Sequence, residues 1–109
     1  MVIATDDNSI AEAANAFGAQ SVMTSTEHQS GSDRIAECAL KLGWPDDHLV
    51  VNLQADEPLM PAACLNQVAA LLESRGDCEV ASLYWPITEA SEVNNPNAVK
   101  VVTDADGRA

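Results

Sequence analysis

Two adjacent carboxylates, Asp56 and Glu57, follow directly on an apolar stretch and are the first candidates for chemistry. Residues 49–53 (LVVNL) are mostly apolar, a pattern typical of a strand covered on both faces in a parallel sheet. Ligands of open α/β sheets bind beyond the carboxyl ends of the strands, where residues 54–58 (QADEP) would lie. A carboxylate there can hold Mg²⁺, which takes one or two protein carboxylates and completes its shell with water and substrate phosphate. From spacing alone, a solvated turn explains these residues about as well.

The second candidate is the polar loop of residues 28–34 (HQSGSDR), just before or within the first turn of a predicted helix. Small hydroxyl residues and glycine let backbone N–H groups approach a ligand, and a helix amino end favours negative charge. Arg34 is one of only five basic residues, and a guanidinium can hold phosphate or carboxylate through two hydrogen bonds. On physical grounds alone the serines are more often helix caps, and Arg34 more often pairs with a neighbour such as Asp33 or Glu37.

Other polar residues give weaker signals. Residues 95–100 (NPNAVK) first of all indicate a turn. A lysine on a strand, such as Lys100, is more often a solvent-reaching edge residue than a residue that binds a substrate. His28 and His48 are isolated, and no Ser or Cys nucleophile can be assigned to either from spacing. A catalytic triad is therefore not supported.

The elements that must position these residues alternate between strand and helix. Ser9 and Glu12 form a capping-box pattern that predicts the start of the first helix. Apolar residues at helical spacing and the stop signals that follow predict helices over residues 10–17, 33–42 and between Pro61 and Gly76, and apolar runs predict strands over residues 1–5, 21–24, 49–53, 79–84 and 98–103. This alternation predicts right-handed βαβ units, and hence an α/β fold with a mainly parallel sheet and flanking helices.

Both ends of the chain look cut. Met1 falls directly on a predicted buried strand, and Asp106-Gly107 is a hairpin signal with only two residues after it. Two residues cannot make the return strand. We therefore expect residues 1–109 to be an internal segment of a larger domain.

Composition narrows the classes of partner. The 109 residues are 47% hydrophobic, enough for the packed core of one small domain. Seventeen acidic and five basic residues give a net charge of -12, which argues against nucleic acid or an anionic membrane surface as partners. Three cysteines without a CxxC pattern favour a reduced, structural role. Without a membrane-length apolar run or a secretory leader, we expect a soluble cytoplasmic protein.

Four motifs taken together resemble the 3-deoxy-manno-octulosonate (KDO) cytidylyltransferases, also called CMP-KDO synthetases. They are residues 2–6 (VIATD), 28–34 (HQSGSDR), 51–58 (VNLQADEP) and 95–102 (NPNAVKVV). The order and spacing are similar to those of the family, and HQSG followed by an arginine and QxDEP are the most telling. The resemblance spans practically the whole chain, but it covers less than half of the full enzyme.

The resemblance implies an α/β nucleotidyltransferase domain of the nucleotide-diphospho-sugar transferase type. Members transfer a cytidylyl group from CTP to KDO, an acidic sugar of lipopolysaccharide, release pyrophosphate, require Mg²⁺ and commonly form homodimers. Ser30 and Gly31 match the segment against the cytosine, and Arg34 and Gln54 match positions that line the nucleotide and sugar site. Asp56 matches a magnesium-binding aspartate, and no other catalytic residue is assigned. The resemblance leaves the role of Asp6 unassigned.

This sequence departs from the family pattern in two ways. Ala55 stands where the family usually has glycine, a change that we expect to be tolerated if the backbone there has a negative φ. The amino-terminal loop that grips the triphosphate and the carboxyl-terminal part, with a second metal-binding aspartate and the dimer contacts, have no counterpart. We therefore expect an incomplete domain that is inactive alone.

Two alternatives stay open. A related acylneuraminate or sugar nucleotidyltransferase is the nearest, although the HQSG loop and the NPNAVK run favour KDO. From a different class comes a free-standing, non-catalytic binding or regulatory module, or a remnant without function.

Overall fold

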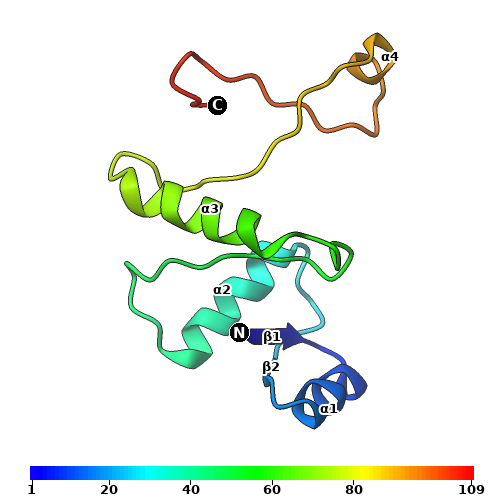
Figure 1. Ribbon diagram of the computed structural model, residues 1–109. Helices are drawn as coiled ribbons and strands as arrows, with labels where there is room; N and C mark the ends of the chain where they lie inside the picture. The colour runs from blue at the N-terminus through cyan, green and yellow to red at the C-terminus, as the bar shows by residue number, and fades with distance from the viewer. The chain divides into compact units, whose positions relative to one another are not determined.

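The computed structural model describes residues 1–109, which form two compact units, Met1–Met60 and Pro61–Ala109. The first unit holds two strands and two helices, and the second holds two helices (Figure 1). In chain order the elements are β1 (Val2–Thr5), α1 (Asn8–Ala16), β2 (Gln20–Met23), α2 (Gly31–Leu42), α3 (Ala62–Ser74) and α4 (Ala90–Val93).

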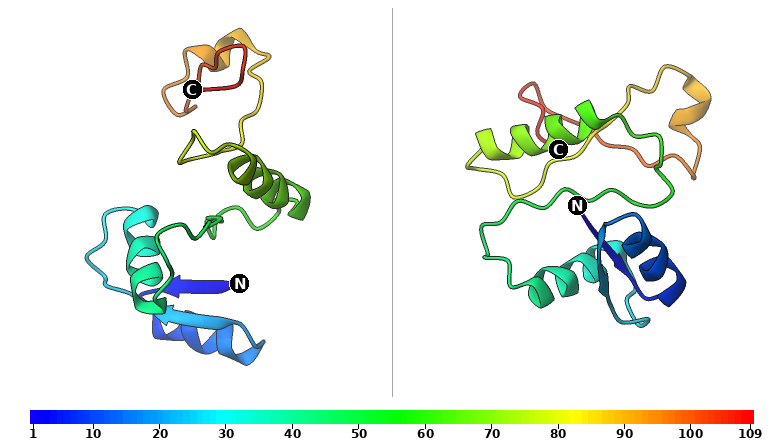
Figure 2. Two further views of the ribbon diagram at one scale, coloured as in Figure 1. Left: turned by 90° about the vertical axis from the view of Figure 1, so that its left-hand side faces the viewer. Right: turned by 60° about the horizontal axis from the view of Figure 1, so that its bottom comes forward.

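The first unit is built on a parallel pair of strands. β1 and β2 pair in register from Val2 opposite Gln20 to Thr5 opposite Met23, and α1 makes the crossover between them. Helices α1 and α2 both pack against the strand pair and not against each other, so the strands lie between them (Figure 2). The predicted α/β class, with a parallel sheet and flanking helices, is confirmed in this unit.

Small side chains bring the helices of the first unit close to the strands. The buried residues come from β1, α1, α2 and the position just after β2, and they are Thr5, Ala11, Ala14, Thr24 and Cys38. All of them are small, so backbone can approach backbone at these points.

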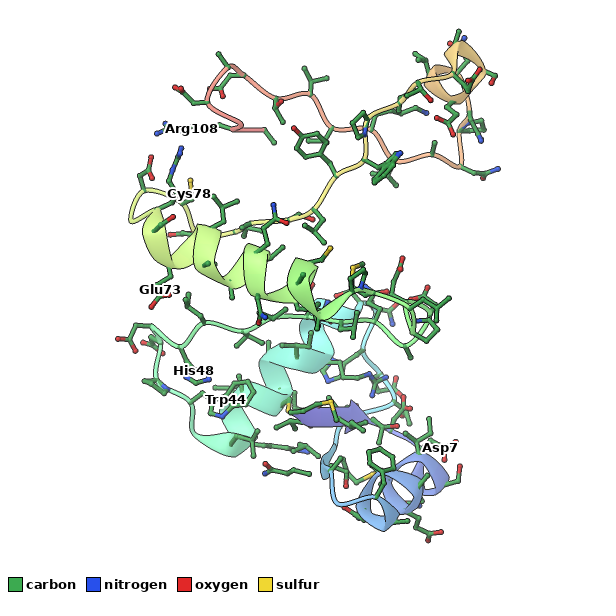
Figure 3. All side chains as sticks on the ribbon, in the orientation of Figure 1. Asp7, Trp44, His48, Glu73, Cys78 and Arg108 are labelled. Carbon is green, nitrogen blue, oxygen red and sulfur yellow. The ribbon has the colours of Figure 1, made fainter.

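Helix α1 begins at Asn8, two residues before its predicted start at residue 10. Asp7, labelled in Figure 3, is the N-cap, because its Oδ1 accepts hydrogen bonds from the backbone N–H of Ser9 (2.7 Å) and of Ile10 (3.4 Å). The Ser9 hydroxyl also donates to Asp7 (2.6 Å), so Ser9 lies inside the helix and does not cap it. The capping-box prediction with Glu12 is therefore wrong, since a carboxylate two residues upstream takes the free N–H groups first.

Helix α2 ends where the glycine signal predicts and begins two residues before its predicted start. Gly43 is the C-cap in the left-handed region (φ 65°), a conformation that glycine adopts without a Cβ penalty. The next residue, Trp44, stacks on His48 with ring centroids 4.8 Å apart and the planes tilted by 33° (Figure 3). This contact gives His48 a structural partner.

The predicted strand at residues 49–53 does not form. The segment has no ladder of hydrogen bonds to β1 or β2, and Leu49, Val50, Val51 and Leu53 keep 41–47% of their surface exposed. The apolar pattern indicates that these side chains favour burial. A strand forms only where its backbone N–H and C=O groups also find hydrogen-bond partners on a neighbouring strand. The only sheet is the β1–β2 pair, and residues 49–53 do not extend it.

Helix α3 confirms the helix predicted between Pro61 and Gly76. Its N-cap is Pro61, which makes no side-chain cap hydrogen bond, and its C-cap is Arg75. The predicted apolar stripe is the more covered face, since each of its members is half-buried while most of the other residues of the helix are exposed; the stripe consists of Leu65, Val68, Ala69 and Leu72. With 13 residues α3 is the longest helix, and no helix has the length and apolarity needed to cross a membrane.

Apart from the short helix α4, which falls in a segment expected to be a connection, the rest of the second unit forms turns and extended chain. The strands predicted at residues 79–84 and 98–103 are absent, and Val99 is 99% exposed. As with residues 49–53, neither segment pairs with another strand, and an apolar run by itself supplies no partner for the backbone N–H and C=O groups. The predicted turn at Gly107 is present with φ 80°, and Arg108 beyond it pairs with Asp77 (Figure 3).

Candidate functional site

The candidate site lies where β1 and β2 end and α2 begins. Parallel strands end at the same edge of a sheet, which places Asp6, just after β1, near Thr24, just after β2. Residues 24–30 connect β2 to α2 without regular secondary structure, and we call them the β2–α2 loop. The amino end of α2 therefore opens at the carboxyl edge of the strand pair.

Ser30 caps α2 and holds its first turn. Its Oγ accepts a hydrogen bond from the backbone N–H of Asp33 (3.2 Å), and its hydroxyl donates to Oδ2 of the same residue (2.7 Å). The capping role anticipated for Ser30 is thus confirmed. The reciprocal contact with Asp33 fixes the first turn of α2. It also sets the direction of the backbone N–H groups of Gly31 and Ser32, which have no hydrogen-bond partner within a helix.

Gly31 and Gln54 lie against each other. A Cβ built on Gly31 would be 3.7 Å from Nε2 of Gln54, an ordinary van der Waals distance. The structure therefore brings together three residues predicted for the substrate site, Ser30, Gly31 and Gln54, although the strand expected to carry Gln54 is not formed. A side-chain amide beside a free helix start offers both donors and acceptors to a polar ligand.

Arg34 is held by the ends of both strands. Its Nη2 pairs with Oδ2 of Asp6 (2.6 Å), and its Nη1 donates to Oγ1 of Thr24 (2.6 Å) and to the carbonyl of Ser25 (3.3 Å). Arg34 thus pairs with neither Asp33 nor Glu37, and the partner that it takes lies 28 residues away in the chain. Its Nε–H has no protein partner.

Glu37 is a residue of this region that sequence reasoning missed except as a neighbour of Arg34. Its carboxylate pairs with Nζ of Lys41 (2.6 Å), accepts from the backbone N–H of Ser25 (2.9 Å) and contacts Nε2 of His28. The Lys41 hydrogen bond, then those from Ser25 and His28, lower the pKa of Glu37 to about 2. The only signal in the sequence is the Glu37–Lys41 spacing of four residues on one helix face.

Asp56 lies in an exposed turn that a hydrogen bond from the Glu57 N–H to the Gln54 carbonyl closes (3.1 Å). No three His, Cys, Asp or Glu residues of the structure group so that they could hold a metal ion, so the chain offers no all-protein cage. The donor chemistry of Asp56 fits the usual Mg²⁺ site, in which one or two carboxylates are completed by water and substrate phosphate. No residue other than glycine has a positive φ, so Ala55 meets the condition under which its extra methyl is tolerated.

Lys100 and Cys38 make contacts within their own units. Lys100 belongs to the second unit, where its Nζ donates to the carbonyl of Asn95. Cys38 is buried in α2, and this burial raises the pKa of its thiol, so it is a poor nucleophile.

Comparison with known proteins agrees with the fold and with the motifs. Residues 1–109 match the family model described as cytidylyltransferase. The chain belongs to the cytidylyltransferase family. The α/β arrangement around β1 and β2 is consistent with such a domain.

Three curated relatives carry the same name, 3-deoxy-manno-octulosonate cytidylyltransferase. The cytidylyltransferase from Thioalkalivibrio sulfidiphilus is 54% identical over 96% of this chain and 42% of its own length. Those from Pseudomonas fluorescens strain SBW25 and from Methylococcus capsulatus are 50% and 51% identical over all of this chain, which covers 43% and 42% of their lengths. The chain therefore spans less than half the length of the curated relatives that it matches.

Proposed function

We propose that the complete protein containing this chain transfers a cytidylyl group from CTP to KDO, giving CMP-KDO and pyrophosphate. The observation that carries the proposal is the 50–54% identity, over 96–100% of the chain, to three relatives with that name. The proposal agrees with the HQSG and QADEP motifs, of which Gly31 and Gln54 lie against each other. As the resemblance implies, the complete enzyme would serve lipopolysaccharide biosynthesis in the cytoplasm as a homodimer.

The nucleotide site that we propose is the start of α2. Backbone N–H groups at the first turn and the Ser30 hydroxyl offer donors to the acceptor atoms of cytosine, and Gly31 lets the flat base approach the backbone. Gln54, which lies against Gly31, would contribute its amide to the nucleotide or the sugar. Arg34 would direct its free Nε–H, and the charge of its guanidinium, toward the anionic groups of the substrates.

Asp56 is the residue that would hold Mg²⁺, together with water and the phosphate oxygens of CTP. When bound, the ion would supply charge neutralisation at the phosphates. The anomeric oxygen of KDO would form the new bond to the α-phosphorus as the bond to pyrophosphate breaks, and the hydroxyl proton would pass to solvent. A carboxylate that binds a divalent cation is held in its charged form. Asp56 would therefore orient the ion and not act as a base.

The test is an assay of the complete protein for pyrophosphate release from CTP, with KDO or an acylneuraminate as acceptor and with or without Mg²⁺. We expect turnover with KDO and Mg²⁺, and none from the 109-residue chain alone. Preference for the acylneuraminate would contradict the proposed acceptor, and no release with either sugar would favour a binding module.

The variant Asp56→Asn tests the metal ligand. We expect it to keep the melting temperature of the wild type while losing most of its Mg²⁺-dependent turnover. The control is Asp47→Asn, an exposed aspartate of the same unit that makes no side-chain hydrogen bond or ion pair, which should retain activity. Full activity of Asp56→Asn would show that Asp56 does not bind the ion.

A further inference from the structure

The β2–α2 loop is held by two oppositely charged side chains of α2, which lie three residues apart. Arg34 donates to the carbonyl of Ser25 (3.3 Å), and Glu37 accepts from the N–H of the same residue (2.9 Å). Both backbone polar groups of Ser25 therefore end on charged side chains. Hydrogen bonds to charged partners are stronger than hydrogen bonds between neutral groups. These two contacts therefore fix the loop at Ser25, close to the end of β2.

Glu37 adds a second point of attachment further along the loop. The same carboxylate oxygen that accepts from Ser25 also contacts Nε2 of His28, which lies two residues before the cap Ser30. Lys41 holds the other oxygen of Glu37 (2.6 Å) and also donates to the carbonyl of Met23 at the end of β2 (2.7 Å). Lys41 thereby holds the carboxylate from within α2. The loop is attached to the same carboxylate through Ser25 in its first half and through His28 in its second half.

We infer that Glu37 is a positioning residue of the proposed cytidylyltransferase, which holds the β2–α2 loop through Ser25 and His28 and so presents Ser30 and Gly31 to the nucleotide. The inference rests on the proposed function for the identity of that nucleotide. On this inference Glu37 acts through the loop and not by contact with the substrate. Its effect on the reaction is to hold the loop in one conformation before CTP binds, so that binding does not have to order the loop.

The geometry separates this role from a general contribution to stability. The three partners of Glu37 are the loop residues Ser25 and His28 and the neighbouring Lys41, and the residue lies on α2 without contact to α1. Loss of Glu37 should therefore loosen the loop and leave the strand pair and α1 in place. The consequence is a weaker affinity for CTP in a protein that is still folded.

The test compares Glu37→Ala with Glu37→Gln in the complete protein. Glu37→Ala should raise KM for CTP about tenfold, the effect of losing one charge-assisted hydrogen bond that orders the site, and leave kcat within about twofold. Glu37→Gln keeps an acceptor oxygen for the Ser25 N–H and should recover most of the affinity. The matched control is Glu12→Ala on α1, a glutamate without an ion pair, which should not change KM.

Hydrogen exchange separates failure of this inference from failure of the proposed function. Glu37→Ala should speed amide exchange over residues 24–30 and leave exchange in α1 unchanged, whatever the substrate is. An unchanged KM in an active enzyme, or unchanged exchange in the loop, would overturn the positioning role. Absence of turnover by the wild type together with faster loop exchange in the variant would overturn the proposed function and leave the loop attachment standing.

Discussion

Replacing Gly31 by alanine separates stability from nucleotide binding. Gly31 is the first residue of α2 and does not adopt a positive φ, and the added Cβ would lie 3.7 Å from Nε2 of Gln54. The methyl group therefore meets no clash within the protein. Glycine-to-alanine changes at compatible positions stabilise by about 0.4–1 kcal/mol, chiefly by restricting the unfolded chain. The free energy of unfolding of the variant should rise by roughly that amount, as measured by urea denaturation.

Binding should change in the opposite direction. If cytosine lies against the Gly31 backbone, the methyl group occupies space that the base needs, and overpacking of this kind costs about 1–3 kcal/mol. KM for CTP should then rise roughly 5- to 150-fold. The control is Gly76→Ala, in open space without a positive φ, which should leave KM unchanged. A Gly31→Ala enzyme with normal KM would refute the nucleotide contact, and one that is less stable would refute the described surroundings of Gly31.

Two more predictions concern the first turns of α2. Ser30→Ala removes the cap on the N–H of Asp33 and should lower the free energy of unfolding by about 0.5–2 kcal/mol, whereas Ser30→Gly should cost only a few tenths; equal losses in urea denaturation would contradict the cap. Because the pKa of Glu37 falls from 4.5 to about 2 on folding, its ionised form stabilises the protein above pH 4.5, and this contribution is lost as the pH falls toward 2. The stability difference between wild type and Glu37→Gln should therefore shrink over that range, with Lys41 and His28 as the facing basic groups, and a pH-independent difference would contradict it.

Helices α1, α2 and α3 and the β1–β2 pair could be predicted from the sequence because their signals are local, whereas the four-residue helix α4 was not predicted. Apolar residues at helical spacing and glycine stops such as Gly43 act within a few residues, and the structure follows them to within about two positions. The start of α1 was misplaced because Asp7 and Ser9 are both good caps, and only the hydrogen bonds decide between them.

The predicted strands at residues 49–53, 79–84 and 98–103 failed for a different reason. Their apolar runs express a preference for burial, but a strand is a relation between two segments, and sequence does not reveal whether a partner edge is within reach. The second unit has no sheet, and the residues expected to be buried in it are largely exposed, as Val99 is.

In the candidate site, too, features set by nearby residues were predicted and a contact between distant residues was not. Sequence reasoning singled out Ser30, Gly31 and Gln54, and the structure brings them together. The sequence predicts partners for Arg34 only among residues close to it in the chain. The Arg34–Asp6 pair joins distant residues, and such pairs follow no sequence spacing from which they could be predicted. That pair gives a structural place to Asp6, which the motifs alone left without a role.

The register of the strand pair also bears on the order of events during folding. Val2 pairs with Gln20 through a single short crossover, so little chain entropy opposes the closure of this unit. The Arg34–Asp6 contact joins residues 28 positions apart and needs both strand ends in place. We therefore expect the βαβ unit to form first and the β2–α2 loop to close on it later. On this view, the edge that we propose to bind the nucleotide is completed late in folding, after the strand pair and α1 have formed.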